Sequence, residues 1–171
     1  MWLLSGMYAK YVTSDKKDAA AHVASTGVEQ FALLEHKATL QSGVYVLGSE
    51  EVTKNAYDRV IPGVDIEKDP FVRLKLQGAE VDFELYLQVT ESVYFPQYVT
   101  YELTAEWEVV DADNGIYKYT GYFDAGTQYD KTIQILKENK LYVSEHYDAD
   151  TEAENGKTFA LTFEAWLRQV D

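Results

Sequence analysis

The sequence contains no cysteine, and it has only three histidines and three prolines among its 171 residues. The lack of cysteine excludes disulfide bonds, thiol nucleophiles and zinc sites with cysteine ligands. Basic residues are few as well: 15 Lys and Arg stand against 29 Asp and Glu, which gives a formal net charge of −14. A surface of this sign repels phosphate backbones and anionic membranes, so we expect no nucleic-acid partner.

Long apolar runs are also missing. None approaches the ~20 residues that a membrane-spanning helix needs, so no span is expected in the mature chain. The first nine residues, MWLLSGMYA, are nevertheless apolar and uncharged, whereas the chain after Lys10 is acidic and rich in tyrosine. An apolar stretch that ends in a small residue resembles the end of a secretory signal peptide. We therefore interpret residues 1–9 as a signal-sequence remnant and predict a secreted protein; an ordinary buried N-terminal strand is the alternative.

Alternation of apolar and polar side chains dominates the remaining sequence. It is clearest in residues 81–90 and 159–168, which are typical of half-buried antiparallel strands. The turn signal Asp113-Asn114-Gly115 predicts a hairpin over residues 106–123. Further short strands are expected at residues 8–13, 28–34, 44–47, 99–103, 129–135 and 141–143.

One helix is predicted over residues 15–24, which are rich in alanine, follow Ser14 as a cap and precede Gly27. About nine short strands with one short N-terminal helix predict an all-β protein, a jelly-roll β-sandwich. Residues 10–171 are expected to form this single domain.

Several segments carry a resemblance to a known family. They are YAKYVTS at residues 8–14, IPGVDIEKDP at 61–70, ILKENKLYVS at 135–144 and FEAWLRQVD at 163–171, with YVTY at 98–101 and Trp107 between them. They resemble the processed N-terminus, a PGVDIPKDP segment, an LKDNKVTVS hairpin and the terminal strand of the TasA/camelysin family, the exported fibre proteins of Gram-positive biofilm matrices. The likeness is to the branch of alternate-signal-mediated exported proteins. Glu67 departs from it, because proline is common there, and the long insertions of the best-known fibre former are absent.

The resemblance implies a jelly roll, export and head-to-tail assembly into filaments by donor-strand complementation. The donor strand would be Lys10, Tyr11, Val12, Thr13 and Ser14, with Tyr11 and Thr13 on one face. Adding a free strand to a sheet edge satisfies main-chain hydrogen bonds, and a head-to-tail contact that does not close gives an open filament. The expected partners are other copies of the chain, with other matrix proteins or the cell wall as further ones. The alternative is that residues 10–14 pair within their own subunit.

No catalytic signature is found. A helical zinc protease needs two histidines four residues apart, and His22, His36 and His146 are far from one another in the sequence. The serines and threonines have no His/Asp arrangement that marks a nucleophile. We therefore do not expect an enzyme, and we interpret the histidines as surface or strand residues.

Two acidic segments place oxygen atoms at alternate positions, as a Ca²⁺ ion would accept. They contain Asp111 and Asp113, and Asp148 and Asp150. Neither completes a twelve-residue calcium loop, and Asp and Asn are equally explained as turn formers. No other cofactor is expected.

Two function hypotheses follow from these observations. The first is a structural subunit of an extracellular matrix or surface fibre. The second is a monomeric exported module on the same sandwich that binds a glycan or a protein. Aromatic residues that could stack on sugars are Tyr94, Phe95, Tyr98, Tyr117, Tyr119 and Tyr122, although aromatic residues are also favoured in strands and cores.

Overall fold

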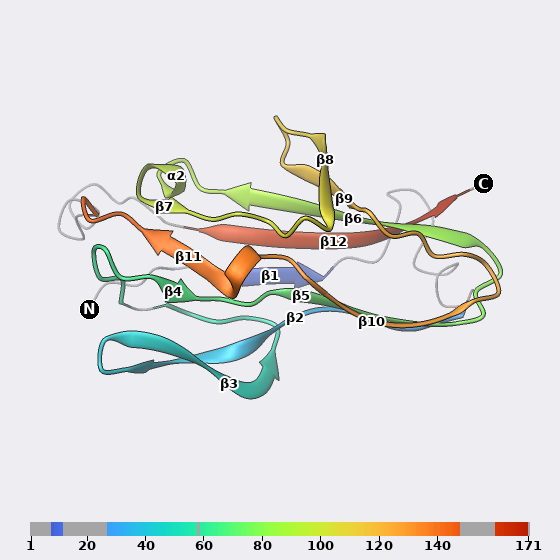
Figure 1. The fold of residues 1–171 in the computed structure, drawn as a ribbon, viewed down its shortest axis with the longest axis horizontal. Helices are drawn as coiled ribbons and strands as arrows, with labels where there is room; N and C mark the ends of the chain where they lie inside the picture. The colour runs from blue at the N-terminus through green and yellow to red at the C-terminus, as the bar shows by residue number, and fades with distance from the viewer. Residues whose placement is uncertain (1–7, 12–26, 58, 148–159, 171) are drawn as a thin grey trace.

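The computed structural model describes residues 8–11, 27–57, 59–147 and 160–170. Within these residues the chain forms twelve strands, one short α-helix and one 3₁₀ turn (Figure 1). The strands are β1 (Tyr8–Tyr11), β2 (Val28–Gln41), β3 (Val44–Val52), β4 (Ile66–Glu67), β5 (Phe71–Gln77), β6 (Asp82–Glu91), β7 (Val99–Thr100), β8 (Trp107–Asp111), β9 (Ile116–Tyr119), β10 (Gln128–Gln134), β11 (Lys140–Val143) and β12 (Leu161–Val170). The helix α2 is Phe95–Tyr98, and the turn η1 is Lys137–Asn139.

The strands form three sheets. The first has the order β1-β12-β6-β9-β8, the second β10-β5-β2-β3, and the third is the small sheet β4-β11-β7. The described strand pairs are antiparallel with one exception, because β1 lies parallel to β12. The N-terminal and C-terminal strands are therefore neighbours in the first sheet.

Alternation along each strand fixes which side chains form the core. In β6, Phe83, Leu85 and Leu87 are fully buried, while the residues between them are half-buried on the opposite face. Leu74 and Leu76 of β5 turn inward in the same way, and the buried residues of both larger sheets form one hydrophobic cluster. Each fully buried leucine or phenylalanine contributes about 1.5–3 kcal/mol. The two sheets are thus held together by their shared apolar interior.

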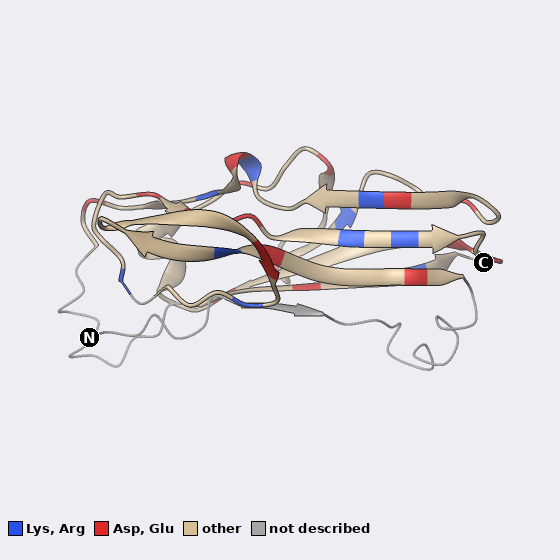
Figure 2. Ribbon diagram, turned by 90° about the horizontal axis from the view of Figure 1, so that it is seen from below, with Lys and Arg blue, Asp and Glu red and all other residues tan. Residues whose placement is uncertain are grey.

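The outer face of the second sheet carries two ion pairs between strands, one from β5 across β2 to β3 and one between the neighbours β5 and β2. Arg73 contacts Glu51 at 2.8 Å, and Lys75 contacts Glu29 at 3.1 Å. β5 carries only basic charges and β3 only acidic ones, and Figure 2 shows a strand with basic bands beside strands that carry acidic bands. Because these pairs face solvent, each contributes at most about 1 kcal/mol.

The predicted all-β class is confirmed, and so is the hairpin over residues 106–123, where β8 and β9 pair around Gly115. The expected number of about nine strands is too low, because the structure adds β4 and the central strand β5. The helix predicted over residues 15–24 lies outside the described residues. Among the described residues, no helix has both the length and the apolar character needed to cross a bilayer.

Candidate functional site

Strand β1 occupies the edge of the first sheet and has a single partner there. Its four residues pair with β12 in parallel register, Tyr8 opposite Thr162 through Tyr11 opposite Ala165. By contrast, β12 pairs with β6 over ten register positions. β1 also lies close to β2 of the second sheet, so it closes one side of the sandwich (Figure 1). The first sheet therefore ends in a short strand that pairs with no strand other than β12 among the described residues, although β2 lies close to it.

The partner strand β12 is firmly placed by its own side chains. Leu161, Phe163, Ala165 and Leu167 are buried in the core, and their alternation is the pattern that the sequence predicts for this strand. β12 therefore keeps its position independently of β1. This leaves its β1 side as a fixed main-chain edge, which any strand of suitable register can fill.

The structure places part of the predicted donor segment in this edge strand. Lys10 and Tyr11 pair with Glu164 and Ala165 of their own chain, which is the arrangement stated above as the alternative to donation. Val12, Thr13 and Ser14 lie outside the described residues. The predicted cleavage point between Ala9 and Lys10 falls in the middle of β1.

The first predicted calcium segment forms the turn of the β8–β9 hairpin. Both carboxylate oxygens of Asp111 accept hydrogen bonds from Asn114, one from its main-chain N–H at 3.2 Å and one from its side chain at 2.8 Å. These bonds lower the pKa of Asp111. Asp113 is exposed, and Asp148 and Asp150 lie outside the described residues. Among the described residues, no three His, Cys, Asp or Glu side chains converge into a metal-binding group.

The two described histidines lie in different settings. His36 in β2 pairs through Nδ1 with Asp69 Oδ2 at 2.6 Å, and its ring lies against Phe71 with centroids 5.4 Å apart. The same aspartate accepts the His36 main-chain N–H at 2.9 Å. His146 is exposed in a turn, and His22 is outside the described residues. Asp69 thus fixes His36 to the start of β5.

The six aromatic residues proposed for sugar stacking do not form one platform. Phe95 and Tyr119 are buried in the core, and Tyr119 stacks on Phe123. Tyr122 is exposed and donates a hydrogen bond to Asp82. The remaining three, Tyr94, Tyr98 and Tyr117, are half-buried and pack against the core cluster. Most of this set serves packing.

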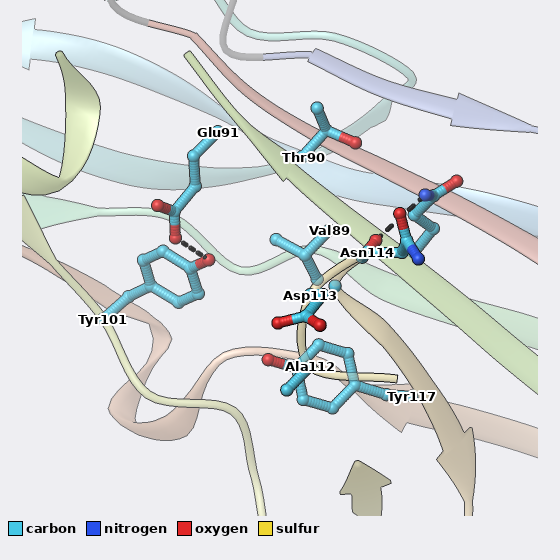
Figure 3. A pocket seen from close by; sticks show the side chains of 10 residues that line it. Val89, Thr90, Glu91, Tyr101, Ala112, Asp113, Asn114 and Tyr117 are labelled. Atoms are coloured by element: carbon cyan, nitrogen blue, oxygen red, sulfur yellow. Dashed lines mark hydrogen bonds between the residues drawn. The ribbon is translucent and has the colours of Figure 1, made fainter. Parts of the chain in front are cut away.

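Tyr117 also lines an open pocket of about 440 Å³ beside the end of β6 and the β8–β9 turn (Figure 3). Within it Tyr101 donates a hydrogen bond to the Glu91 carboxylate. Burial, and then this bond, raise the pKa of Tyr101. A second hollow of about 540 Å³ shares Glu91, Tyr101 and Tyr117. Both volumes lie within the range of about 300–1,000 Å³ that is usual for ligand pockets.

The sequence predicts Tyr117 as a candidate sugar-stacking residue, but neither Tyr101 nor Glu91 was among the predicted binding residues. These two are ten residues apart in the chain, and their pairing depends on the turn through α2, which the alternation pattern does not mark. The pocket walls carry Glu91, Glu102 and Asp113 and no lysine or arginine. The pocket is therefore acidic and partly aromatic.

Comparison of the chain with protein-family models, with curated proteins and with solved structures found no match. The resemblance to the TasA/camelysin family therefore stays a prediction from the sequence segments that carry it.

Proposed function

We propose that this protein is an exported structural subunit of an extracellular fibre, which assembles head to tail when the N-terminal strand of one subunit pairs with β12 of the next. The observation that supports this is the position of β1, a four-residue parallel strand at the edge of an otherwise antiparallel sheet. A strand held by so few main-chain pairs exchanges at low cost, because it makes the same hydrogen bonds in a neighbour.

Cleavage between Ala9 and Lys10 would act directly on this strand. It would remove the first two of the four register positions, Tyr8 opposite Thr162 and Ala9 opposite Phe163. The two register positions that remain, Lys10 and Tyr11, would hold the strand less firmly within its own subunit. In this proposal the intact N-terminus caps the subunit, and its removal opens the edge of β12 to a second copy.

We also propose that the two larger sheets are connected as a jelly roll. The chain passes from the second sheet to the first between β5 and β6, and returns between β9 and β10. Its last strand, β12, lies again in the first sheet, beside β6 and β1. Such repeated crossing between two packed sheets is typical of sandwiches with Greek-key or jelly-roll connections.

The test compares three chains: the full sequence, a chain that begins at Lys10 and a chain that begins at Val23. The chain from Lys10 should form filaments with a regular repeat in electron micrographs. The full chain should sediment as a monomer because β1 caps it, and the chain from Val23 should stay monomeric because it has no donor. If all three stay monomeric at high concentration and the amides of residues 10–14 are protected from exchange in the monomer, the proposal is wrong.

A pair of proline variants of the Lys10 chain shows which edge is used. Tyr11→Pro removes a main-chain donor from the proposed donor strand and should abolish filaments. Val110→Pro is the matched control on β8, the opposite edge of the same sheet. Val110 is exposed and lies at the register shift between Val109 and Asp111, so it tolerates proline. Loss of filaments in Val110→Pro alone would place the contact at β8 instead.

The acidic pocket favours a second candidate function, a module that binds a glycan or a protein. Its size and the side chains of Tyr101, Tyr117 and Glu91 suit a small ligand group. This candidate predicts ligand-dependent shifts of the Tyr101 and Tyr117 NMR signals in the monomer. Screening of the full chain against oligosaccharides and peptides checks it, and a Tyr117→Ala variant should lose any such binding.

A further inference from the structure

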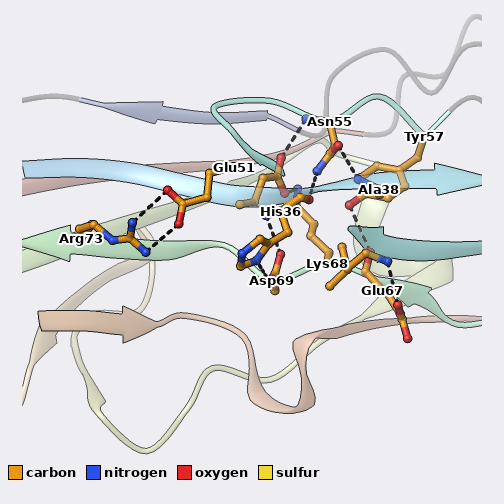
Figure 4. A network of polar contacts seen from close by, with 11 residues as sticks. His36, Ala38, Glu51, Asn55, Tyr57, Glu67, Lys68, Asp69 and Arg73 are labelled. Atoms are coloured by element: carbon orange, nitrogen blue, oxygen red, sulfur yellow. Dashed lines mark hydrogen bonds and ion pairs between the residues drawn. The ribbon is translucent and has the colours of Figure 1, made fainter. Parts of the chain in front are cut away.

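A buried cluster of polar side chains lies where β2, the segment after β3 and the segment after β4 meet (Figure 4). Its centre is the pair Glu35 and Lys68, and both side chains are fully buried. Lys68 Nζ lies 2.6 Å from Glu35 Oε2. The other carboxylate oxygen, Oε1, accepts the main-chain N–H of Asn55 at 2.9 Å. Every other ion pair of the described residues is partly exposed.

Among the described residues, the Lys68 amine has few partners for a charged group. An ammonium has three N–H donors, but within this part of the chain Lys68 Nζ makes one hydrogen bond, to Glu35, and it faces the Tyr57 ring, whose centroid is 5.2 Å away. Burial lowers the pKa of Lys68, against the opposing effect of Glu35. A buried lysine in such surroundings is the kind that becomes a nucleophilic amine.

We propose that Lys68 and Glu35 become joined by an intramolecular isopeptide bond between Lys68 Nζ and Glu35 Cδ. The ammonium first passes one proton to Oε2 along the hydrogen bond. The neutral amine then attacks Cδ, and the Asn55 N–H stabilises the negative charge that develops on Oε1. A second proton moves from Nζ to Oε2, the Cδ–Oε2 bond breaks, and one water molecule leaves. The step needs no oxidant or other reagent.

The surroundings favour this product over the ion pair. Two buried charges carry a large desolvation penalty, and a neutral amide removes both of them. Asn55 is not the acyl donor, because its own side chain is already engaged. Its Oδ1 accepts the Ala38 N–H at 2.9 Å, and its Nδ2 donates to the His36 carbonyl at 2.8 Å.

The bond would serve a chain that has no disulfides. Glu35 and Lys68 are 33 residues apart, so an amide between them closes a loop between β2 and the start of β5. Closing such a loop lowers the conformational entropy of the unfolded chain, as a disulfide does.

Peptide mapping of the full chain tests the proposal. The protein is folded, incubated until its intact mass is constant, denatured and digested. We expect a branched peptide that contains residues 35 and 68, lighter than its two parts by one water molecule. Glu102 and Lys137 are the internal control, because their N···O distance is also 2.6 Å but their side chains are 67% and 57% exposed; they should stay unlinked.

Two results would overturn the proposal. If Lys68 and Glu35 are recovered only in unlinked peptides, the pair is an ion pair and no bond forms. If Lys68 is linked to Asn55 with the loss of one ammonia, Glu35 is not the acyl donor. A Lys68→Arg variant should give no branched peptide, whereas Lys137→Arg should retain it. Because the deciding measurement is made on the unaltered chain, it does not depend on whether the Lys68 variant folds.

Discussion

The side chain of Asn55 makes hydrogen bonds to main-chain groups of β2, and its removal should lower the free energy of unfolding. The pairing of β2 with β3 shifts register between His36 and Ala38. At this position the Asn55 amide accepts the Ala38 N–H and donates to the His36 carbonyl, at 2.9 and 2.8 Å. Asn55 itself is 5% exposed. Asn55→Ala would therefore leave one main-chain donor and one acceptor without their partner in the protein.

The size of the effect follows from these two groups. An unsatisfied buried polar group costs about 1–3 kcal/mol. Because His36 and Ala38 are only half-buried, water reaches them in part, and we expect a loss of about 2–4 kcal/mol in the free energy of unfolding. The matched control is Asn114→Ala, in which an exposed turn asparagine loses its side-chain hydrogen bond to Asp111 but keeps the bond from its main-chain N–H. This control should cost less than about 1 kcal/mol.

Equilibrium unfolding in urea, followed by tryptophan fluorescence, gives both values. The midpoint for Asn55→Ala should fall while the slope with denaturant stays constant, which marks a change in stability alone. A loss for Asn55→Ala no larger than that for Asn114→Ala would refute the reasoning. It would mean that the two main-chain groups find other partners, or that their hydrogen bonds contribute nothing measurable.

Two further predictions concern Glu84 of β6 and the glycine of the β8–β9 turn. The hydrogen bond from Lys118 holds the pKa of Glu84 below its usual value of 4.5. This carboxylate therefore stabilises the fold above that pH and ceases to do so as the pH falls through its lowered pKa, so the difference in melting temperature between the unaltered chain and Glu84→Gln should shrink in acid. Gly115 has φ +63° and an added Cβ would lie 2.3 Å from Val89 O, whereas Gly126 has φ +76° and open space. Gly115→Ala should therefore lower the melting temperature clearly more than Gly126→Ala, which costs about 1 kcal/mol.

The parts of the fold that the sequence predicted well are those specified by local pattern. The alternation in β6 and β12 places Phe83 and Phe163 inward without any knowledge of their partners. The Asp113-Asn114-Gly115 turn likewise defines the β8–β9 hairpin, because Gly115 needs a positive φ. β5 alternates just as clearly, but no strand was predicted there: the segment interpreted through its family resemblance ends at Pro70, just before β5 begins.

Contacts between distant segments could not be predicted in this way. Nothing in the neighbourhood of Lys68 distinguishes it from a surface lysine, because its burial depends on Glu35, 33 residues earlier. The parallel pairing of β1 with β12 joins the two ends of the chain, and local alternation carries no information about which edge a strand occupies. The candidate donor residues Lys10 and Tyr11 were therefore named correctly as a strand, while their cis partner was found only in the structure.

The exchanged strand and the proposed cross-link would lie on the same path of tension through the subunit. In a filament made by exchange of β1, tension on one subunit enters through its donated strand and reaches the beginning of β2, the next described strand of the chain. It leaves through β12, which holds the strand of the neighbour. Pulling from Val28 would separate β2 from β5 and β3 one residue after another. Glu35 lies halfway along β2, so a covalent bond from it to Lys68 would stop that separation before the second half of the strand and carry the tension into the β4–β5 segment. A fibre subunit without cysteine would gain more from a cross-link at this point than from one at an exposed pair such as Glu102 and Lys137, which lies outside β2 and would not hold it.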